Sequence, residues 1–183
     1  RARLLLDQLL TLTRVQEPSA MAVSPVSLEQ IFRQILEDLH PRAAAKSIDI
    51  EVTGEQGASI ILAESDLITL LRNLVDNAIK YTPAGGRIDL SVGVDDRGVV
   101  VEVSDNGPGI APSERALVFE PFHRVLGNDE AGSGLGLSIV KAITDRYAAS
   151  VALDYTDVAQ SCGLRVTVSF RGSERNAGTI TQR

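Results

Sequence analysis

Hydrophobic residues recur along this chain with two different periods, and the change of period predicts where helices and strands lie. Apolar positions three or four apart, such as Leu28, Ile31 and Ile35, are typical of an amphipathic helix. Alternation at every second position, as at Ile48 and Ile50, is typical of a strand. The expected helices are 27 to between 40 and 45, 65–81 and 137–147, and the expected strands are 48–52, 59–62, 87–94, 99–104, 151–155 and 164–170.

The order of these elements favours one fold class. Strands 87–94 and 99–104 flank a turn at Asp95, Asp96 and Gly98, residue types that suit a hairpin. Strands 48–52 and 59–62 are joined by a glycine-containing turn. Because paired strands alternate with helices, we expect an α+β fold: a two-layer α/β sandwich with one mixed, mostly antiparallel sheet and helices on one face.

Before this domain, the first 16 residues have a leucine pattern of their own. Leu5, Leu9 and Leu12 follow spacings of four and three, which are typical of a helix packed against other helices. We expect 1–16 to be the end of such a helix, 17–26 a linker, 27–171 the globular domain and 172–183 a disordered tail. Since the chain opens at Arg1 inside a helical pattern, we expect it to be a piece of a longer protein.

Composition and charge narrow the classes of function. With 44% hydrophobic and 23% charged residues, the 183-residue chain has the balance of a soluble globular protein. Its formal net charge of -6 disfavours nucleic-acid binding. The single cysteine, Cys162, excludes an internal disulfide and fits a reducing compartment.

Three segments carry residues that suit nucleotide chemistry. On helix 65–81, Asn73, Asn77 and Lys80 fall within about 60° of arc and offer amide oxygens and a cation, which suit magnesium and phosphate. A solvated helix face explains them equally well, although two asparagines cost about 0.5 kcal/mol each in helix propensity. The segment 105–110 is either a tight turn or a wall for a base, with Asp105 as acceptor for an amine. The glycines of 132–136 lead into a helix, where backbone N–H groups bind phosphate.

Together these segments resemble a known family. Four motifs occur in order: Asn73-Leu-Val-Asp-Asn77-Ala-Ile-Lys80-Tyr81, Asp105-x-Gly107-x-Gly109, Phe119-Glu-Pro-Phe122-x-Arg124 and Gly132-x-Gly134-x-Gly136. In this order they resemble the ATP-binding domain of sensor histidine kinases, which has the Bergerat fold of the GHKL superfamily. The opening residues 6–14 are similar to the end of a dimerisation and phosphoacceptor helix of that family.

The resemblance implies a role for each site residue. Asn77 would coordinate Mg²⁺, with Asn73 supporting the phosphates of ATP. Lys80 and Tyr81 would contact the phosphates and the nucleotide, and Arg124 would face the γ-phosphate. The base would meet Asp105, Gly107 and Gly109, and the phosphates would meet the glycine-rich residues of the lid. The implied catalytic residues are Asn73, Asn77, Lys80 and Arg124, and the implied nucleotide-binding residues are Asn77, Lys80, Tyr81, Asp105, Gly107, Gly109, Gly132, Gly134, Leu135 and Gly136.

The acceptor histidine of such a kinase is not among the two histidines of this chain. His40 lies beside Pro41 at a helix end, and His123 lies between Phe122 and Arg124, where we expect a hinge of the lid. We expect Phe119 and Phe122 to pack the base of the lid. The pair Ala148-Ala149 stands where this family often has two glycines, and we expect it to affect a turn without altering the site.

Three functions stay open at this point. The first is transfer of the γ-phosphoryl of ATP to a histidine in a phosphoacceptor domain outside this chain, for relay to a response regulator. The intact protein would be a homodimer, and this part the cytoplasmic domain of a membrane-anchored bacterial sensor kinase. The second is an ATPase of the wider superfamily that drives conformational change, although those enzymes usually place a glutamate where this chain has Asn73. The third is nucleotide binding without turnover.

Overall fold

The computed structural model describes residues 8, 10, 13, 22–125 and 132–171. The predicted leucine seam, the polar residues 127–130 and the tail 172–183 therefore lie outside the described residues. The helices are α2 (Leu28–Ala45), α3 (Glu64–Tyr81) and α4 (Gly136–Arg146), with a short 3-10 helix, η1, at Leu117–Phe119. The strands are β1 (Ser24–Ser27), β2 (Asp49–Gly54), β3 (Ser59–Leu62), β4 (Arg87–Asp95), β5 (Gly98–Asp105), β6 (Ser150–Asp154) and β7 (Arg165–Arg171).

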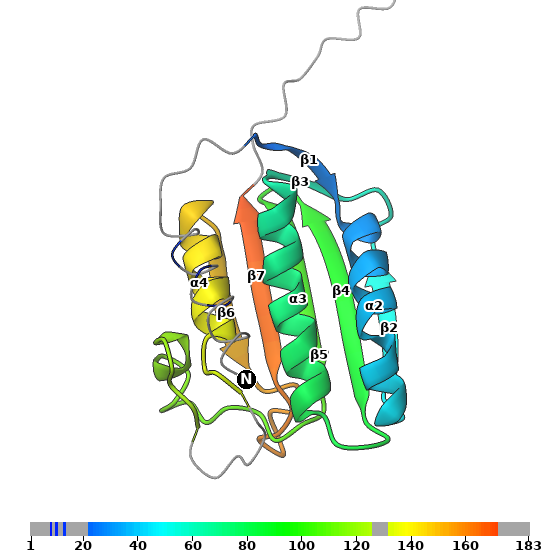
Figure 1. Cartoon of the computed structure of the whole chain (residues 1–183), viewed down its shortest axis with the longest axis vertical. Helices are drawn as coiled ribbons and strands as arrows, with labels where there is room; N and C mark the ends of the chain where they lie inside the picture. The colour runs from blue at the N-terminus through cyan, green and yellow to red at the C-terminus, as the bar shows by residue number, and fades with distance from the viewer. Residues whose placement is uncertain (1–7, 9, 11–12, 14–21, 126–131, 172–183) are drawn as a thin grey trace, which may run out of the picture.

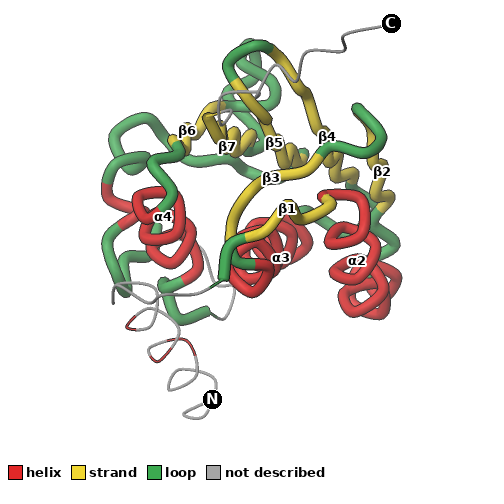
Figure 2. Tube along the Cα trace, turned by 90° about the horizontal axis from the view of Figure 1, so that it is seen from above, coloured by secondary structure: helices red, strands yellow, loops and turns green. Residues whose placement is uncertain are grey.

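The elements form two layers. Five strands make one mixed sheet in the order β2-β4-β5-β7-β6, in which β2 runs parallel to β4 and the other neighbours are antiparallel. The helices α2, α3 and α4 all lie on one face of this sheet (Figures 1 and 2). This arrangement confirms the predicted two-layer sandwich with a mostly antiparallel sheet.

The core lies between the two layers, and α3 occupies its centre. Leu67, Leu70 and Leu71 on one side of α3 are fully buried, as are Leu90 and Val101 on the facing side of the sheet. Alternate residues of the same strands point to the opposite face, where the polar residues Ser91 of β4, Glu102 of β5 and Thr167 of β7 lie side by side in register. The alternation that predicted the strands therefore separates a helix-covered face from a polar one.

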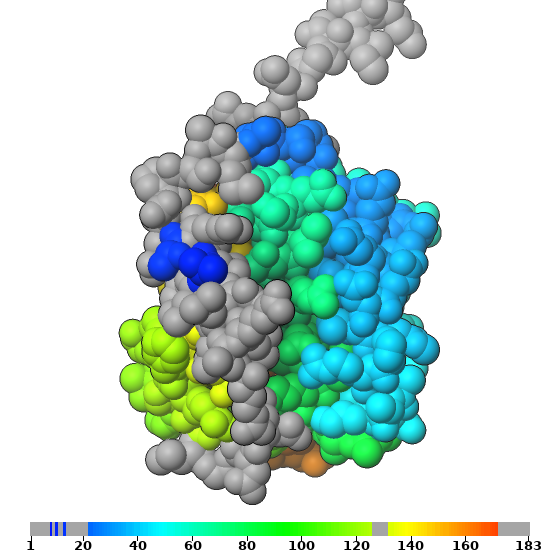
Figure 3. Space-filling view, in the orientation of Figure 1, coloured from blue at the N-terminus to red at the C-terminus, as the bar shows by residue number. Residues whose placement is uncertain are grey.

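The α2 and α3 helices lie against one another on the helical side of the molecule (Figure 3). Ser27 caps α2 by accepting a hydrogen bond from the backbone of Gln30, as its position in the sequence predicts. The helix continues through Pro41 to Ala45, the longer of the two ends that the pattern allowed. At the surface an ion pair joins Arg72 of α3 to Asp38 of α2 at 2.7 Å.

The structure differs from the prediction around the first strands. Strands β2 and β3 exist, but they do not pair with each other: β2 joins the large sheet beside β4, and β3 pairs with β1 in a separate two-stranded sheet. Residues 24–26, assigned above to the linker, belong to β1. Alternation of apolar and polar residues predicts that a segment is extended. Its partner depends on long-range packing, which is why the pairing differed.

Within the described part of the chain, none of the helices combines the length and the apolar character needed to cross a bilayer.

Candidate functional site

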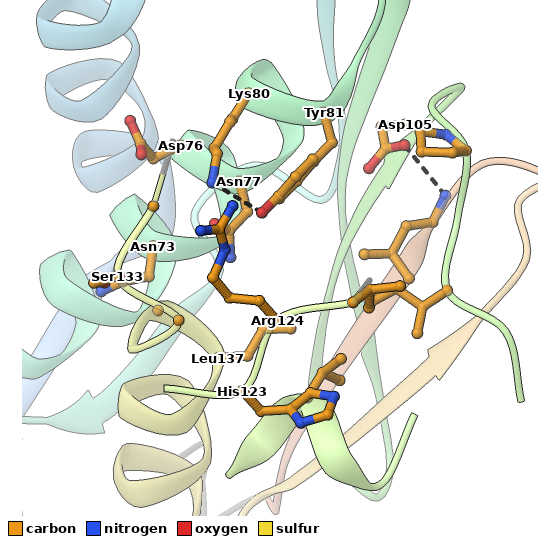
Figure 4. A pocket seen from close by; sticks show the side chains of 18 of the residues that line it. Asn73, Asp76, Asn77, Lys80, Tyr81, Asp105, His123, Arg124, Ser133 and Leu137 are labelled. Carbon is orange, nitrogen blue, oxygen red and sulfur yellow. Dashed lines mark hydrogen bonds between the residues drawn. The ribbon is translucent and has the colours of Figure 1, made fainter. Parts of the chain in front are cut away.

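A cavity of about 580 Å³ opens between α3, the loop that follows β5 and the start of α4. This volume is in the range of small-molecule sites. Two walls of different construction face each other across it (Figure 4). We call Asn73, Asn77, Lys80 and Tyr81 the helix side, because all four come from α3, and we call Asp105, Pro108, Gly109, Ile110 and Leu164 the loop side.

The helix side consists of side chains that one face of α3 brings together. Asn73 donates through Nδ2 to the carbonyl of Thr69 at 2.8 Å, so this amide is oriented by its own helix. A Cβ added to Gly136 would lie 3.2 Å from both Asn73 Oδ1 and Asn77 Nδ2. The two amides therefore meet the first residue of α4 with room for little more than a hydrogen atom, and the glycine permits this approach.

Lys80 and Tyr81 complete the helix side at the end of α3. The Lys80 ammonium donates to the Tyr81 hydroxyl at 2.8 Å and lies 4.5 Å from the centre of the Tyr81 ring. A Cβ on Gly132 would come within 2.3 Å of Lys80 Nζ, so the first glycine of the predicted lid lies directly against this cation. Gly134 has φ +74, a conformation that favours glycine, and packs against the backbone of Phe122.

The loop side begins with Asp105, the last residue of β5, whose exposed fraction is 5%. One carboxylate oxygen, Oδ1, accepts hydrogen bonds from the backbone N–H groups of Gly107 at 2.8 Å and Leu164 at 3.2 Å. Burial raises the pKa of Asp105 above its ordinary value, and the two backbone hydrogen bonds oppose that rise. The carboxylate is thus fixed by backbone while it lines the cavity.

The remaining lining of this end is mostly apolar. Pro108, Ile110 and Leu164 line the cavity together with Asp105, and so do Val118 of η1 and Leu137 of α4. An apolar slot with one carboxylate at its end suits a flat heterocycle that carries an amine.

Most of the predicted site residues lie at this one cavity. The ten that line it are Asn73, Asn77, Lys80, Tyr81, Asp105, Gly109, Arg124, Gly132, Gly134 and Gly136. Two do not. Leu135 is fully buried in the core, and Gly107 lies behind Asp105, where a Cβ would come 2.7 Å from the Tyr81 carbonyl oxygen. Both residues therefore shape the lining from behind.

The segment before the predicted lid places two polar residues at the cavity. The Arg124 side chain points toward the space beside Asn77 and Lys80 (Figure 4). His123 also lines the cavity, and its Nε2 lies 2.8 Å from Glu114 Oε2. Phe122 differs from the prediction, because the residue is 56% exposed. Its backbone N–H donates to the carbonyl of Gly134 and so contacts the glycine-rich stretch.

Sequence reasoning missed a lysine behind the helix side. Lys46 follows α2, and its ammonium donates to the carbonyls of Ile79, Lys80 and Thr82 at 3.0, 2.7 and 3.0 Å. The last carbonyls of a helix lack intrahelical partners, and a cation satisfies them and the helix dipole together. Lys46 thus fixes the end of α3 from which Lys80 and Tyr81 project. Its proximity to α3 has no local signal, because the two positions are more than thirty residues apart.

Arg42 and Asp76, also missed, line the cavity where α2 meets α3 and form an ion pair there.

The fold and this cavity together define an ATP-binding domain of one superfamily. The family model of histidine kinase-, DNA gyrase B- and HSP90-like ATPases matches residues 62–179, so the chain belongs to that family. Within it, the chain is an ATP-binding catalytic domain of the sensor histidine kinase type, as its relatives show.

Three of these relatives illustrate the likeness. The sensor protein QseC of Escherichia coli O157:H7 is 37% identical over 153 residues, which cover 82% of this chain and 33% of QseC. A solved structure of the mycobacterial sensor histidine kinase MprB is 34% identical, with a TM-score of 0.74 over 82% of this chain and 97% of that one. Full-length ShkA in complex with AMPPNP is 28% identical, with a TM-score of 0.78 over 92% of this chain and 36% of ShkA. The chain spans about a third of the length of the curated relatives it matches.

Proposed function

We propose that this cavity binds magnesium-ATP and that the domain donates the γ-phosphoryl group to a histidine of a phosphoacceptor domain outside this chain. The observation that carries the proposal is the division of the cavity into two ends. One end offers amides and cations, and the other offers a buried carboxylate in an apolar slot. ATP has the matching polarity, with charged phosphates at one end and a flat base at the other.

At the loop side, the base is adenine. Its exocyclic amine donates to Asp105, whose Oδ1 is held by two backbone N–H groups. The apolar neighbours Ile110 and Leu164 cover the faces of the ring. A purine with a carbonyl in place of that amine would direct an acceptor at the carboxylate, so the slot selects adenine over hypoxanthine.

At the helix side, the phosphates meet Lys80, Arg124 and the start of α4. The donor set fits magnesium in one respect: Asn77 supplies a hard oxygen, and Mg²⁺ in nucleotide sites is usually held by one or two protein groups together with substrate phosphates and water. The ion would offset phosphate charge, with Asn73 supporting the phosphates one turn earlier on α3. In this proposal Lys80 and Arg124 neutralise the charge that develops during transfer.

The reaction forms a bond between an imidazole nitrogen of the acceptor histidine and the γ-phosphorus. The bond between that phosphorus and the bridging oxygen breaks, and ADP leaves with the electron pair. The acceptor domain belongs to the same protein, which we propose to be a homodimer that relays the phosphoryl group to a response regulator. The relatives named as sensor proteins support this relay. A similar solved structure, the cytoplasmic segment of histidine kinase QseC, supports a cytoplasmic position for this domain, which we propose belongs to a membrane-anchored bacterial kinase.

Binding and transfer are tested separately. Titration of the chain with ATP and Mg²⁺ in a calorimeter should give saturable 1:1 binding, and its absence would overturn the nucleotide site. Incubation with γ-labelled ATP and a separately supplied phosphoacceptor domain should then label that domain. The label should be lost in acid and kept in alkali, as expected for a phosphorus–nitrogen bond. Steady release of phosphate without any acceptor would instead support an ATPase that drives conformational change.

A further inference from the structure

We propose that Arg115 is a positioning residue for base recognition: it braces the loop side of the cavity through Tyr155, so that Asp105 and Gly109 keep the geometry that selects adenine. This inference rests on the proposed function, because it concerns the same site. Arg115 does not line the cavity and belongs to none of the four sequence motifs.

Arg115 links two segments that are far apart in the chain. Its Nε donates to the carbonyl of Ile110 at 3.2 Å, and its Nη1 lies 3.1 Å from Asp154 Oδ1 at the end of β6. Its guanidinium carbon lies 4.7 Å from the centre of the Tyr155 ring. The side chain is only 22% exposed, so one cation is held by a carbonyl, a carboxylate and an aromatic face together.

The carboxylate of Asp154 is held in position by a backbone hydrogen bond as well as by Arg115. The backbone N–H of Tyr155 donates to Asp154 Oδ1 at 2.8 Å, and this bond and then the Arg115 guanidinium hold the pKa of the Asp154 carboxyl below its ordinary value. These contacts favour the charged form of the carboxylate, which accepts from both the Arg115 guanidinium and the Tyr155 N–H.

From Tyr155 the contacts reach the loop side directly. Gly109 has φ +75, and a Cβ there would lie 2.9 Å from the Tyr155 ring and 2.7 Å from the Gly163 carbonyl oxygen. The backbone N–H groups of Gly163 and the next residue connect this segment to the loop side. Gly163 donates to the carbonyl of Gly107 at 2.7 Å, and Leu164 donates to the carboxylate of Asp105. The connection between β6 and β7 is thus the outer wall of the loop side, and Arg115 fastens it to Ile110.

The position of this brace predicts an effect on one end of the ligand only. The contacts of Arg115 with Ile110, Asp154 and Tyr155 are all at the loop side. On the helix side, Lys80 is instead held by Tyr81 and the end of α3 by Lys46. Loss of the brace lets Ile110 and Gly109 move relative to Asp105. The difference in affinity between a base that donates to the carboxylate and one that does not then becomes smaller. A general loss of stability would instead weaken the binding of both kinds of nucleotide equally.

The test compares ATP with inosine triphosphate, which replaces the exocyclic amine by a carbonyl and keeps the triphosphate. Dissociation constants for both, each with Mg²⁺, are measured for the wild-type chain and for Arg115→Ala, Tyr155→Leu and Asp105→Asn. We expect the wild type to prefer ATP, and we expect Asp105→Asn to abolish the preference. Arg115→Ala and Tyr155→Leu should reduce it about five- to tenfold, mainly through weaker ATP binding. Arg33→Ala is the matched control, because Arg33 pairs with Glu29 on the exposed side of α2 and should leave the ratio unchanged.

The outcomes separate this inference from the function on which it rests. If the wild-type chain binds neither nucleotide, the proposed function fails. If the wild type prefers ATP and Asp105→Asn removes the preference while Arg115→Ala and Tyr155→Leu keep it, the brace is wrong and the function stands. If Arg115→Ala is poorly folded, Arg115→Lys decides: lysine keeps the ion pair but loses the planar contact with Ile110 and Tyr155, and we expect a two- to fivefold loss of the ratio. An unchanged ratio in Arg115→Lys and Tyr155→Leu would overturn the proposal.

Discussion

The two sides of the cavity are built in different ways. On the helix side, Asn73, Asn77 and Lys80 project from one face of α3, and the site is a set of side chains on a rigid rod. On the loop side, backbone does most of the positioning, since Asp105 is held by the N–H groups of Gly107 and Leu164. The helix side therefore depends on residue identity, whereas the loop side depends on contacts between distant segments.

This difference decides how each side should respond to substitution. A change on the helix side removes a group that we propose binds the phosphates, and it leaves α3 in place. A change on the loop side alters the shape of a slot whose walls come from three segments: 105–110, η1 and the connection of β6 to β7. Substitutions can separate the two sides if affinity is measured for whole nucleotides and for their parts.

The largest effect is expected from Asn77→Ala. In the proposed function, Asn77→Ala removes an amide that binds Mg²⁺ and the phosphates. Interactions of this kind with charged groups contribute about 2–3 kcal/mol, which corresponds to roughly 30- to 150-fold in ATP affinity. Calorimetric titration with Mg²⁺ measures it. Arg72→Ala is the matched control on the same helix, because Arg72 pairs with Asp38 at the surface. Adenosine, which lacks phosphates, should bind Asn77→Ala as it binds the wild type. Equal losses for adenosine and ATP would contradict a helix side that is specific for phosphate.

Lys46→Met tests whether the helix side depends on the end of α3. The substitution removes three hydrogen bonds from an ammonium to carbonyls of the last turn, and the free energy of unfolding should fall by about 1–3 kcal/mol. Denaturant unfolding with unchanged m-value would measure this loss. ATP affinity should fall about three- to tenfold, because Lys80 and Tyr81 belong to that turn. Arg33→Met, which breaks an exposed ion pair, should cost less than about 0.5 kcal/mol. A stable Lys46→Met variant with full affinity would show that α3 needs no anchor at this end.

Asp105→Asn tests the loop side. The asparagine oxygen can still accept from Gly107 and Leu164, so the fold should survive, while the amide group no longer matches the adenine amine. We expect about tenfold weaker ATP binding, or roughly 1.4 kcal/mol. Binding of magnesium tripolyphosphate, which lacks the base, should be unchanged, and a parallel loss of tripolyphosphate binding would contradict the separation of the two sides.

The same variant has a pH dependence of defined sign. Because burial raises the pKa of Asp105 above its ordinary 3.8, the folded state favours the neutral carboxyl. This contribution to stability is present below pH 3.8 and is lost as the pH rises through the folded-state pKa. Relative to the wild type, Asp105→Asn should therefore gain stability between acidic and neutral pH in denaturant unfolding curves. If Asp105→Asn instead gained stability relative to the wild type as the pH falls, the two backbone hydrogen bonds would outweigh burial in their effect on the pKa of Asp105.

The contrast between the two sides also explains what could be predicted from the sequence. Helix periodicity was sufficient to place Asn73, Asn77 and Lys80 on one face, because i and i+4 positions are neighbours in any α-helix. The helices, the β4–β5 hairpin and the two-layer architecture follow from the same local rules. The pairing of β2 with β4 and of β1 with β3 could not be read in this way, since it depends on segments that meet only in the folded chain.

The supports of the site are harder to predict for the same reason. Lys46 and Arg115 are ordinary surface residue types in the sequence. The partners of Lys46 lie 33 to 36 positions away, and Arg115 joins nearby Ile110 to Asp154, which lies 39 positions away. Leu164 donates to Asp105 across 59 positions through a backbone N–H that every non-proline residue has, so side-chain identity gives no signal at all. Residue types in the motifs therefore indicate the kind of ligand, whereas the residues that hold the motifs in place can be identified only from the folded structure.

The smallest expected effect concerns a region remote from both sides, the turn between α4 and β6. Ala148 has φ +50, and the N–H groups of Ala148 and Ala149 donate to the carbonyls of Asp145 and Thr144, the pattern that ends a helix with one left-handed residue. Alanine pays about 1–2 kcal/mol in that conformation, and glycine removes this strain at the cost of about 0.4–1 kcal/mol from a more flexible unfolded chain. Ala148→Gly should therefore raise the free energy of unfolding by about 0.5–1 kcal/mol. Ala149→Gly is the matched control and should lower it, since Ala149 is not among the residues with positive φ. Both variants should bind ATP and inosine triphosphate as the wild type does, because residues 145–150 do not line the cavity. A changed ratio of the two affinities in Ala148→Gly would mean that α4 transmits strain from its far end to Gly136.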